Sequence, residues 1–289
     1  MQTAWAMPWW TTMVIISAIN FIIAIFLFAK SLKAKKLEPE NKKYFLVTRT
    51  LGIIFVSVAM YRTVFVSNYP DRLAWFDTIF NSPLVIRSLA LFAELSFIGI
   101  ITIILLKLNR DIKNINVGEN IKERSFLEKM PFVAAACLIL AQFFAYAGLI
   151  GQSLTMFAIE ETLWAVGFLS ITPLVLTRLK ELKPYKEIAK RYRVFLTILA
   201  VWCFGYLSFQ CFFALPFMHY AEIASDIGKS FPSDALQTAL FDFTATRDFS
   251  TWGGIGFFIW HSGYFTICAW MVLYFMTAPR VISNKTKPS

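Results

Sequence analysis

Seven long apolar segments follow one another along the chain, and they constrain its fold more than any motif does. Each is roughly 18 to 25 residues long, the length an α-helix needs to cross a bilayer. Lipid offers the backbone no hydrogen bonds, and the segments are far longer than the strands of a membrane barrel. The sequence therefore predicts an all-α integral membrane protein with seven transmembrane helices, at residues 9–29, 45–66, 84–107, 131–150, 154–177, 194–217 and 252–277.

The composition agrees with a multi-pass membrane protein: 57% of the 289 residues are hydrophobic and 17% are aromatic, with a mean hydropathy of +0.59. Residues 1–289 are predicted to form a single membrane domain. The longest stretch outside the predicted helices is 218–251. There, Ser233 or Asp234 can cap a short helix with Leu236, Leu240 and Phe243 on one face. We expect this stretch to lie on the outer surface, where it could act as a lid.

Lysine and arginine residues are concentrated in alternate links, at 30–43, 107–129 and 178–193, and in the tail at 280–287. The positive-inside rule places these regions in the cytoplasm, so we expect the N-terminus outside and the C-terminus inside. A bacterial cytoplasmic membrane fits the compact chain, although other membranes obey the same physics. The net charge of +10 is then explained by orientation and by attraction to anionic lipid headgroups. No nucleic-acid partner is predicted.

Glu94 lies near the middle of the third apolar segment, where a charged side chain is costly. Placing an acid at the centre of a membrane helix costs about 3 kcal/mol even on lenient insertion scales. Such residues usually face the interior of a bundle and mark a functional site. Arg87 precedes Glu94 by two helical turns and is expected on the same face.

An α-helix rises about 1.5 Å per residue, so the depth of each residue can be counted from the predicted end of its helix. This count places most other unusual polar residues in the outer half of the bundle. This pattern predicts an outward-facing polar cavity above a packed cytoplasmic half. Trp75 and Phe76 in the second link suit an interfacial aromatic belt. The candidate residues for the cavity are Arg62, Arg87, Glu94, Gln142, Glu160, Glu161, Trp164, Gln210, Trp260, His261 and Tyr264.

The charged candidates have an alternative structural interpretation. Two arginines and three glutamates can form ion pairs that only hold the helices together, since polar contacts join helices in membranes. The excess of acid leaves at least one carboxylate to be protonated, hydrated, or paired with a histidine or a ligand.

Three classes of function remain open. In the first, the protein binds and moves a small solute or proton, with Glu94 and His261 changing protonation and Arg62 and Arg87 attracting an anionic group. In the second, it is a membrane enzyme acting on a lipid, prenyl or quinone-like molecule, in which Glu94, Glu160 and His261 supply acid and base groups. A receptor or assembly subunit is the third. Binding, with proton-linked transport, ranks first because no catalytic motif is present.

No particular cofactor is predicted. His219 and His261, with Glu94 and Glu160, are weak candidates for a metal site because no pair of histidines has a ligand-like spacing. A retinal Schiff base needs a lysine in the last helix, and residues 251–277 contain none.

Overall fold

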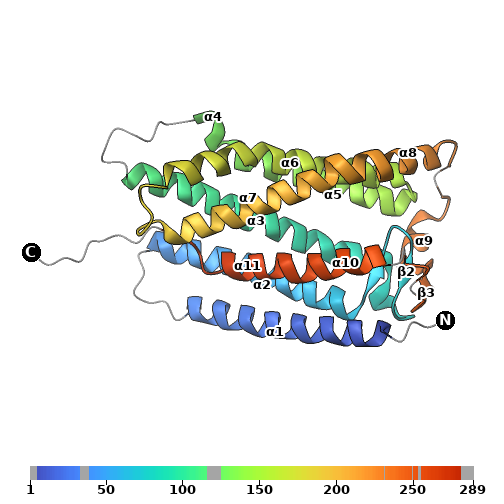
Figure 1. The fold of residues 1–289 in the computed structure, drawn as a ribbon. Coiled ribbons are helices and arrows are strands. Elements are labelled where there is room, and N and C mark those ends of the chain that lie inside the picture. The colour runs from blue at the N-terminus through green and yellow to red at the C-terminus, as the bar shows by residue number, and fades with distance from the viewer. Residues whose placement is uncertain are drawn as a thin grey trace, which may run out of the picture.

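A computed structural model of the protein describes residues 5–32, 39–115, 125–230, 232–248, 250–252 and 255–280 (Figure 1). Long helices run side by side, with three very short strands at one end of the bundle. We call this end the strand end, and the opposite end, where the lysine-rich links lie, the basic end. The long helices are α1 (Ala6–Leu32), α2 (Pro39–Val64), α3 (Pro83–Ile115), α5 (Met130–Gly151), α6 (Leu154–Glu181) and α7 (Lys190–Phe209).

The six long helices and a seventh helical segment near the C-terminus confirm the predicted positions. All seven are long and apolar enough to cross a membrane, which is consistent with a multi-pass integral membrane protein. Most extend beyond the predicted windows because polar residues continue the helix past its apolar part. The candidate spans are Ala6–Leu32, Pro39–Val64, Pro83–Lys113, Phe126–Gly151, Leu154–Glu181, Lys190–Asp226 and Gly256–Phe275.

The sixth and seventh segments change their winding partway along. The π-helix η2 (Gln210–His219) continues α7 and leads into α8 (Tyr220–Asp226). The helix therefore runs nine residues past the predicted end at residue 217, and the 218–251 stretch is a loop only from residue 227 onward. The last segment likewise consists of α10 (Ile255–Gly263), the π-helix η3 (Tyr264–Cys268) and α11 (Ala269–Phe275).

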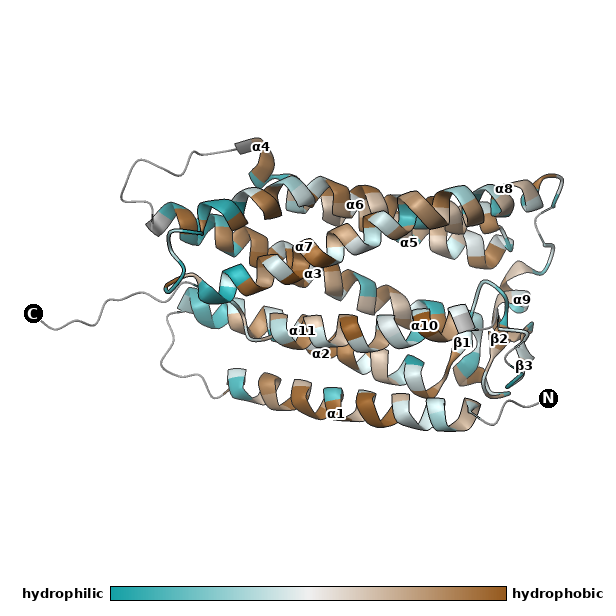
Figure 2. Ribbon diagram, in the orientation of Figure 1, coloured by the Kyte–Doolittle hydropathy of each residue, from teal (hydrophilic) through white to brown (hydrophobic). Residues whose placement is uncertain are grey.

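Helix α3 is central and α1 is peripheral. Within their most apolar windows, 61% of α3 is buried in the protein and only 22% of α1. Helix α3 contacts α2, α5 and α11, while α5 pairs with α6 and α6 with α7. Apolar residues run along the middle of the helices, and hydrophilic residues gather at the basic end (Figure 2).

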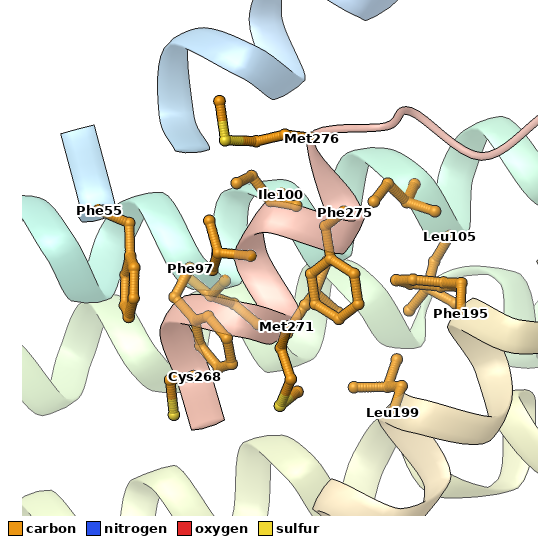
Figure 3. Close-up of a cluster of buried hydrophobic side chains, with 14 of the residues drawn as sticks. Phe55, Phe97, Ile100, Leu105, Phe195, Leu199, Cys268, Met271, Phe275 and Met276 are labelled. Carbon is orange, nitrogen blue, oxygen red and sulfur yellow. The ribbon is translucent and has the colours of Figure 1, made fainter. Parts of the chain in front are cut away.

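Large side chains from three helices interlock in the core near the basic end (Figure 3). Phe97 of α3 lies near Met271 of α11, and Phe195 of α7 meets Phe275 with ring centroids 4.9 Å apart; Leu105 of α3 belongs to the same cluster. These contacts join α3, α7 and α11 through apolar side chains.

The strand end is covered by a small cap. Strands β1 (Ser67–Asn68) and β2 (Leu73–Ala74) pair antiparallel, and β3 (Thr244–Ala245) pairs parallel to β2. Arg72, between β1 and β2, has a positive φ of 54°. Its guanidinium donates to the Thr238 carbonyl oxygen at 2.8 Å and to the Asp242 carboxylate at 3.1 Å. Arg72 thus ties helix α9 (Ala235–Phe241) to the loop that joins the strands.

Two expectations for this end need correction. The short helix forms where predicted, with Asp234 as its N-cap, but the Asp234 side chain makes no capping bond. The buried residue of α9 is Ala239, whereas Leu236 is 59% exposed. Trp75 does not lie in an interfacial belt: it is buried against Trp9 and Trp252.

The basic end contains more buried polarity than expected. Arg178, counted above among the loop cations, is only 1% exposed. It donates to Asn109 at 3.0 Å, to Glu128 at 3.0 Å and to Glu181 at 2.7 Å. These contacts join α3, α4 (Ser125–Glu128) and α6 at the basic end of the bundle.

Candidate functional site

Arg87 and Glu94 form a bidentate ion pair within α3. Arg87 Nη1 lies 2.9 Å from Glu94 Oε1, and Nη2 lies 3.1 Å from Oε2. Seven residues place the two side chains two turns apart on one face, as predicted. Both are buried, and the parallel pairing of guanidinium and carboxylate is the strongest geometry for such a pair.

Gln142 of α5 completes the coordination of this pair. Its amide nitrogen donates to Glu94 Oε2 at 2.8 Å, and its carbonyl oxygen accepts from Arg87 Nη2. Glu94 therefore accepts three hydrogen bonds and its charge is fully compensated. We call Arg87, Glu94 and Gln142 the ion-pair lock, because they join α3 to α5.

Glu160 of α6 approaches the same arginine but is much less well coordinated. Its Oε1 lies 3.4 Å from Arg87 Nη1, and this is the only ion pair that Glu160 makes within the described residues. It accepts no hydrogen bond there, although its side chain is only 8% exposed. Of the two buried carboxylates beside Arg87, Glu160 is the one that is free to bind another group.

Arg62 of α2 is the second buried cation of this region, and it has no anionic partner. It is 5% exposed, and within the described part of the chain its side chain makes neither a hydrogen bond nor an ion pair. Its guanidinium lies instead over two rings, 5.1 Å from the centroid of Phe265 and 5.8 Å from that of Tyr69. A ring face attracts a cation but offers no acceptor in the guanidinium plane.

Tyr69 joins the two cations and was not among the predicted site residues. Its hydroxyl accepts from Arg87 Nη1 at 3.4 Å, and its ring faces both Arg62 and Arg87. Burial, reinforced by the Glu160 carboxylate, raises the pKa of the Tyr69 hydroxyl well above its ordinary value, so the group stays neutral. Tyr69 lies in a loop, so helical depth could not place it; the only signal was an aromatic residue beside Pro70 in a turn-rich link.

His261 of α10 lies close to Arg62. It is buried, and neither ring nitrogen has a hydrogen-bond partner among the described residues, although the backbone of Arg62 is close enough to act on the ring. Aromatic rings surround it, with Phe265 at 4.5 Å and Trp9 at 5.2 Å between centroids. Burying an imidazole without hydrogen bonds costs free energy, so the two unpaired ring nitrogens in this apolar setting require an explanation.

The remaining aromatic candidates differ in how near they lie to the charges. Tyr264 is close enough to Glu94 and Arg62 for both charges to act on its hydroxyl. Tyr264 stacks on Trp260 at 5.6 Å between centroids. Trp164 is buried in the apolar core beside Phe168.

A pocket of about 210 Å³ lies at the strand end, directly above Tyr69. Its walls include Arg72, Leu149, Phe157 and Lys229. Tyr69 lines this pocket and its ring also contacts Arg62 and Arg87, so it links the pocket to the buried charges.

Three predicted residues belong to a different cluster. Glu161 points toward α7, where its carboxylate accepts from the Gln210 amide and from the Tyr206 hydroxyl at 3.2 Å. His219 contacts Gln210 at 3.3 Å and Glu222 at 2.8 Å. Neighbouring glutamates thus serve different clusters, because successive helical residues point about 100° apart.

The described residues contain no group of three or more histidine, cysteine or acidic side chains that could hold a metal ion. His219 and His261, the two weak metal candidates, lie in separate clusters. Comparison of the chain with models of protein families, with curated proteins and with solved structures found no match.

Proposed function

We propose that the protein is a multi-pass membrane protein that binds a small anionic or zwitterionic molecule at Arg62, in a cavity reached from outside. The observation that carries this proposal is that Arg62 is a buried cation without an acceptor, beside a carboxylate and an imidazole that also lack hydrogen bonds. Isolated buried charges are strongly disfavoured unless something pairs with them.

The arrangement separates structural charges from ligand-binding charges. In the ion-pair lock, Glu94 and both Nη atoms of Arg87 bond to protein groups, and Arg87 Nε is the one donor of the lock left without a partner among the described residues. Arg62, Glu160 and His261 do have unused donors and acceptors. We call these three residues the Arg62 site.

The chemistry of the Arg62 site defines the class of ligand. A carboxylate, sulfonate or phosphate group would satisfy the guanidinium of Arg62. The rings of Phe265 and Tyr69 favour an apolar or aromatic body next to that acidic group. A donor group on the ligand, or a proton, would satisfy Glu160.

The entry route that we propose runs through the pocket at the strand end. The basic links favour placing the strand end outside the membrane and the basic end in the cytoplasm. The ring of Tyr69 would move to connect the pocket to the Arg62 site. At the basic end the buried contacts of Arg178 join α3, α4 and α6. Transport through the protein would require these three helices to separate.

Benzenesulfonate is a suitable probe, because it carries a permanent negative charge on an aromatic ring. Benzamide is the matched neutral control. Ligand binding stabilises the folded state, by about 2.7 kcal/mol at about one hundred times the dissociation constant. We expect benzenesulfonate, and not benzamide, to raise the unfolding temperature of the purified protein.

Three variants at two arginines localise the binding. Arg62→Gln should abolish the stabilisation by benzenesulfonate, whereas Arg62→Lys should retain part of it. Arg72→Gln, which changes a charge in the pocket wall, should leave the stabilisation in place. If Arg72→Gln abolishes it while Arg62→Gln does not, the anion binds in the outer pocket and the proposal is wrong.

A further inference from the structure

The second polar cluster depends on the unusual winding of η2. His219 and Gln210 are nine residues apart, which in an α-helix is two and a half turns and puts the two side chains on opposite faces. The wider π-helical winding brings His219 back to the Gln210 face, where Nε2 lies 3.3 Å from Oε1. π-Helical turns are rare and frequently occur at functional sites.

The orientation of the Gln210 amide is determined by its neighbours. Its nitrogen contacts the Glu161 carboxylate, which can only accept, and the Tyr206 hydroxyl oxygen at 3.2 Å. The carbonyl oxygen therefore faces His219. Reversing the amide would place oxygen against oxygen at Glu161, so an ionised Glu161 fixes this orientation.

His219 is consequently flanked by acceptors on both sides. Nδ1 faces the Glu222 carboxylate at 2.8 Å, and Nε2 faces the Gln210 carbonyl oxygen. A neutral imidazole has one N–H and can donate to only one of them, whereas the doubly protonated ring donates to both. The hydrogen-bond geometry thus matches an imidazolium.

We propose that Glu161 and His219 form a coupled proton-binding site, linked by the Gln210 amide. A proton that binds the Glu161 carboxylate neutralises it and lets the amide rotate. The amide nitrogen then faces His219 Nε2, which must become an acceptor, so Nε2 loses its proton to water while Nδ1 keeps the proton that it donates to Glu222. One proton is bound and one is released, so the net charge of the cluster is conserved.

The groups that act on this site come from all the elements packed against it. Tyr206 of α7, His219 of η2 and Glu222 of α8 act on Glu161, and Glu160 adjoins it on α6. The side chain of Glu222 is 24% exposed, which gives the cluster a contact with solvent. The proposal does not rest on the Arg62 site.

The chain contains only two histidines, so their protonation can be read separately. Nitrogen-labelled histidine in protein embedded in phosphatidylcholine nanodiscs gives two sets of ring signals by NMR spectroscopy, and His261→Gln assigns them. At neutral pH we expect His219 to be doubly protonated in the wild type. Glu161→Gln should reduce the doubly protonated signal several-fold, whereas Glu160→Gln should leave it unchanged.

Gln210→Leu tests the linkage and serves as a second variant if Glu161→Gln does not fold. It should reduce the doubly protonated signal on its own. In its presence, Glu161→Gln should cause no further change. A neutral His219 in the wild type, or the same His219 signal with and without the Glu161 carboxylate, would overturn the proposal.

Discussion

Arg87 and Glu94 bind one another through two parallel hydrogen bonds of 2.9 and 3.1 Å, from positions two turns apart on the same helix. An ion pair within one helix does not by itself join two helices. It is Gln142, which bonds to both partners, that connects α3 to α5. The costly acid near the middle of the third apolar segment is therefore best explained as part of a structural network.

Removing both members of the pair should cost less free energy of unfolding than the sum of removing each one alone. Arg87→Gln leaves Glu94 buried and uncompensated, and we expect it to lower the free energy of unfolding by about 3–5 kcal/mol. The double variant Arg87→Gln/Glu94→Gln should lose less than the sum of the two single variants. Chemical denaturation in nanodiscs measures the difference. Arg110→Gln, which breaks an exposed pair with Glu40, is the control and should change little. Additive losses for Arg87 and Glu94 would contradict the ion-pair lock.

Binding of an anion to Arg62 should be linked to proton uptake at Glu160. A negative ligand beside an ionised Glu160 is repelled, so protonation of Glu160 favours binding and binding favours protonation. The affinity for benzenesulfonate should rise as the pH is lowered from 8 to 5. Glu160→Gln should raise the affinity at pH 8 and remove most of the pH dependence.

The adjacent position provides the matched control for this linkage. Glu161→Gln changes the same chemical group on the same helix but in the other cluster. It should leave the pH dependence of benzenesulfonate binding close to that of the wild type. Equal effects of the two substitutions would show that the linkage does not come from Glu160.

Tyr69 should control the rate at which the Arg62 site is reached. Tyr69→Phe keeps the ring between the pocket and the arginines and loses only the 3.4 Å contact with Arg87. Tyr69→Ala removes the ring. Stopped-flow tryptophan fluorescence should show faster association of benzenesulfonate with Tyr69→Ala than with Tyr69→Phe, which should behave like the wild type. Equal association rates for all three proteins would rule out Tyr69 as the barrier.

The proposed orientation can be tested with cysteines at two exposed positions. Asp77→Cys lies near the strand end, and Lys186→Cys lies in the link between α6 and α7 at the basic end. A membrane-impermeant maleimide should label Asp77→Cys in intact cells and Lys186→Cys only after permeabilisation, with Cys211 changed to serine in both. The reverse pattern would place the strand end in the cytoplasm.

The sequence predicted the parts of the structure that follow from local patterns. The seven helices follow from apolar length, and the Arg87–Glu94 contact follows from helical periodicity. The sequence could not predict that Glu160 and Glu161 belong to different clusters. That prediction requires knowing which helix packs against each face of α6. It also could not place Tyr69, which reaches Arg87 from a loop.

The continuation of the sixth helix was missed for a related reason. Residues 218–226 contain His219, Glu222 and Asp226, which end the apolar window although the helix continues. Hydropathy measures the apolar length of a segment and carries no information about π-helical winding. A projection that assumes α-helical winding therefore could not predict the contact between Gln210 and His219.

Arg62 and Arg87 have different proposed roles: Arg62 binds a ligand, and Arg87 belongs to the ion-pair lock. An experimental map of the protein in nanodiscs with benzenesulfonate, by electron cryo-microscopy, tests this most directly. We expect density for the sulfonate at the Arg62 guanidinium, beside Phe265, with Arg87 still bound to Glu94. Density for the sulfonate only in the pocket near Arg72, with Arg62 paired directly to Glu160, would contradict these roles.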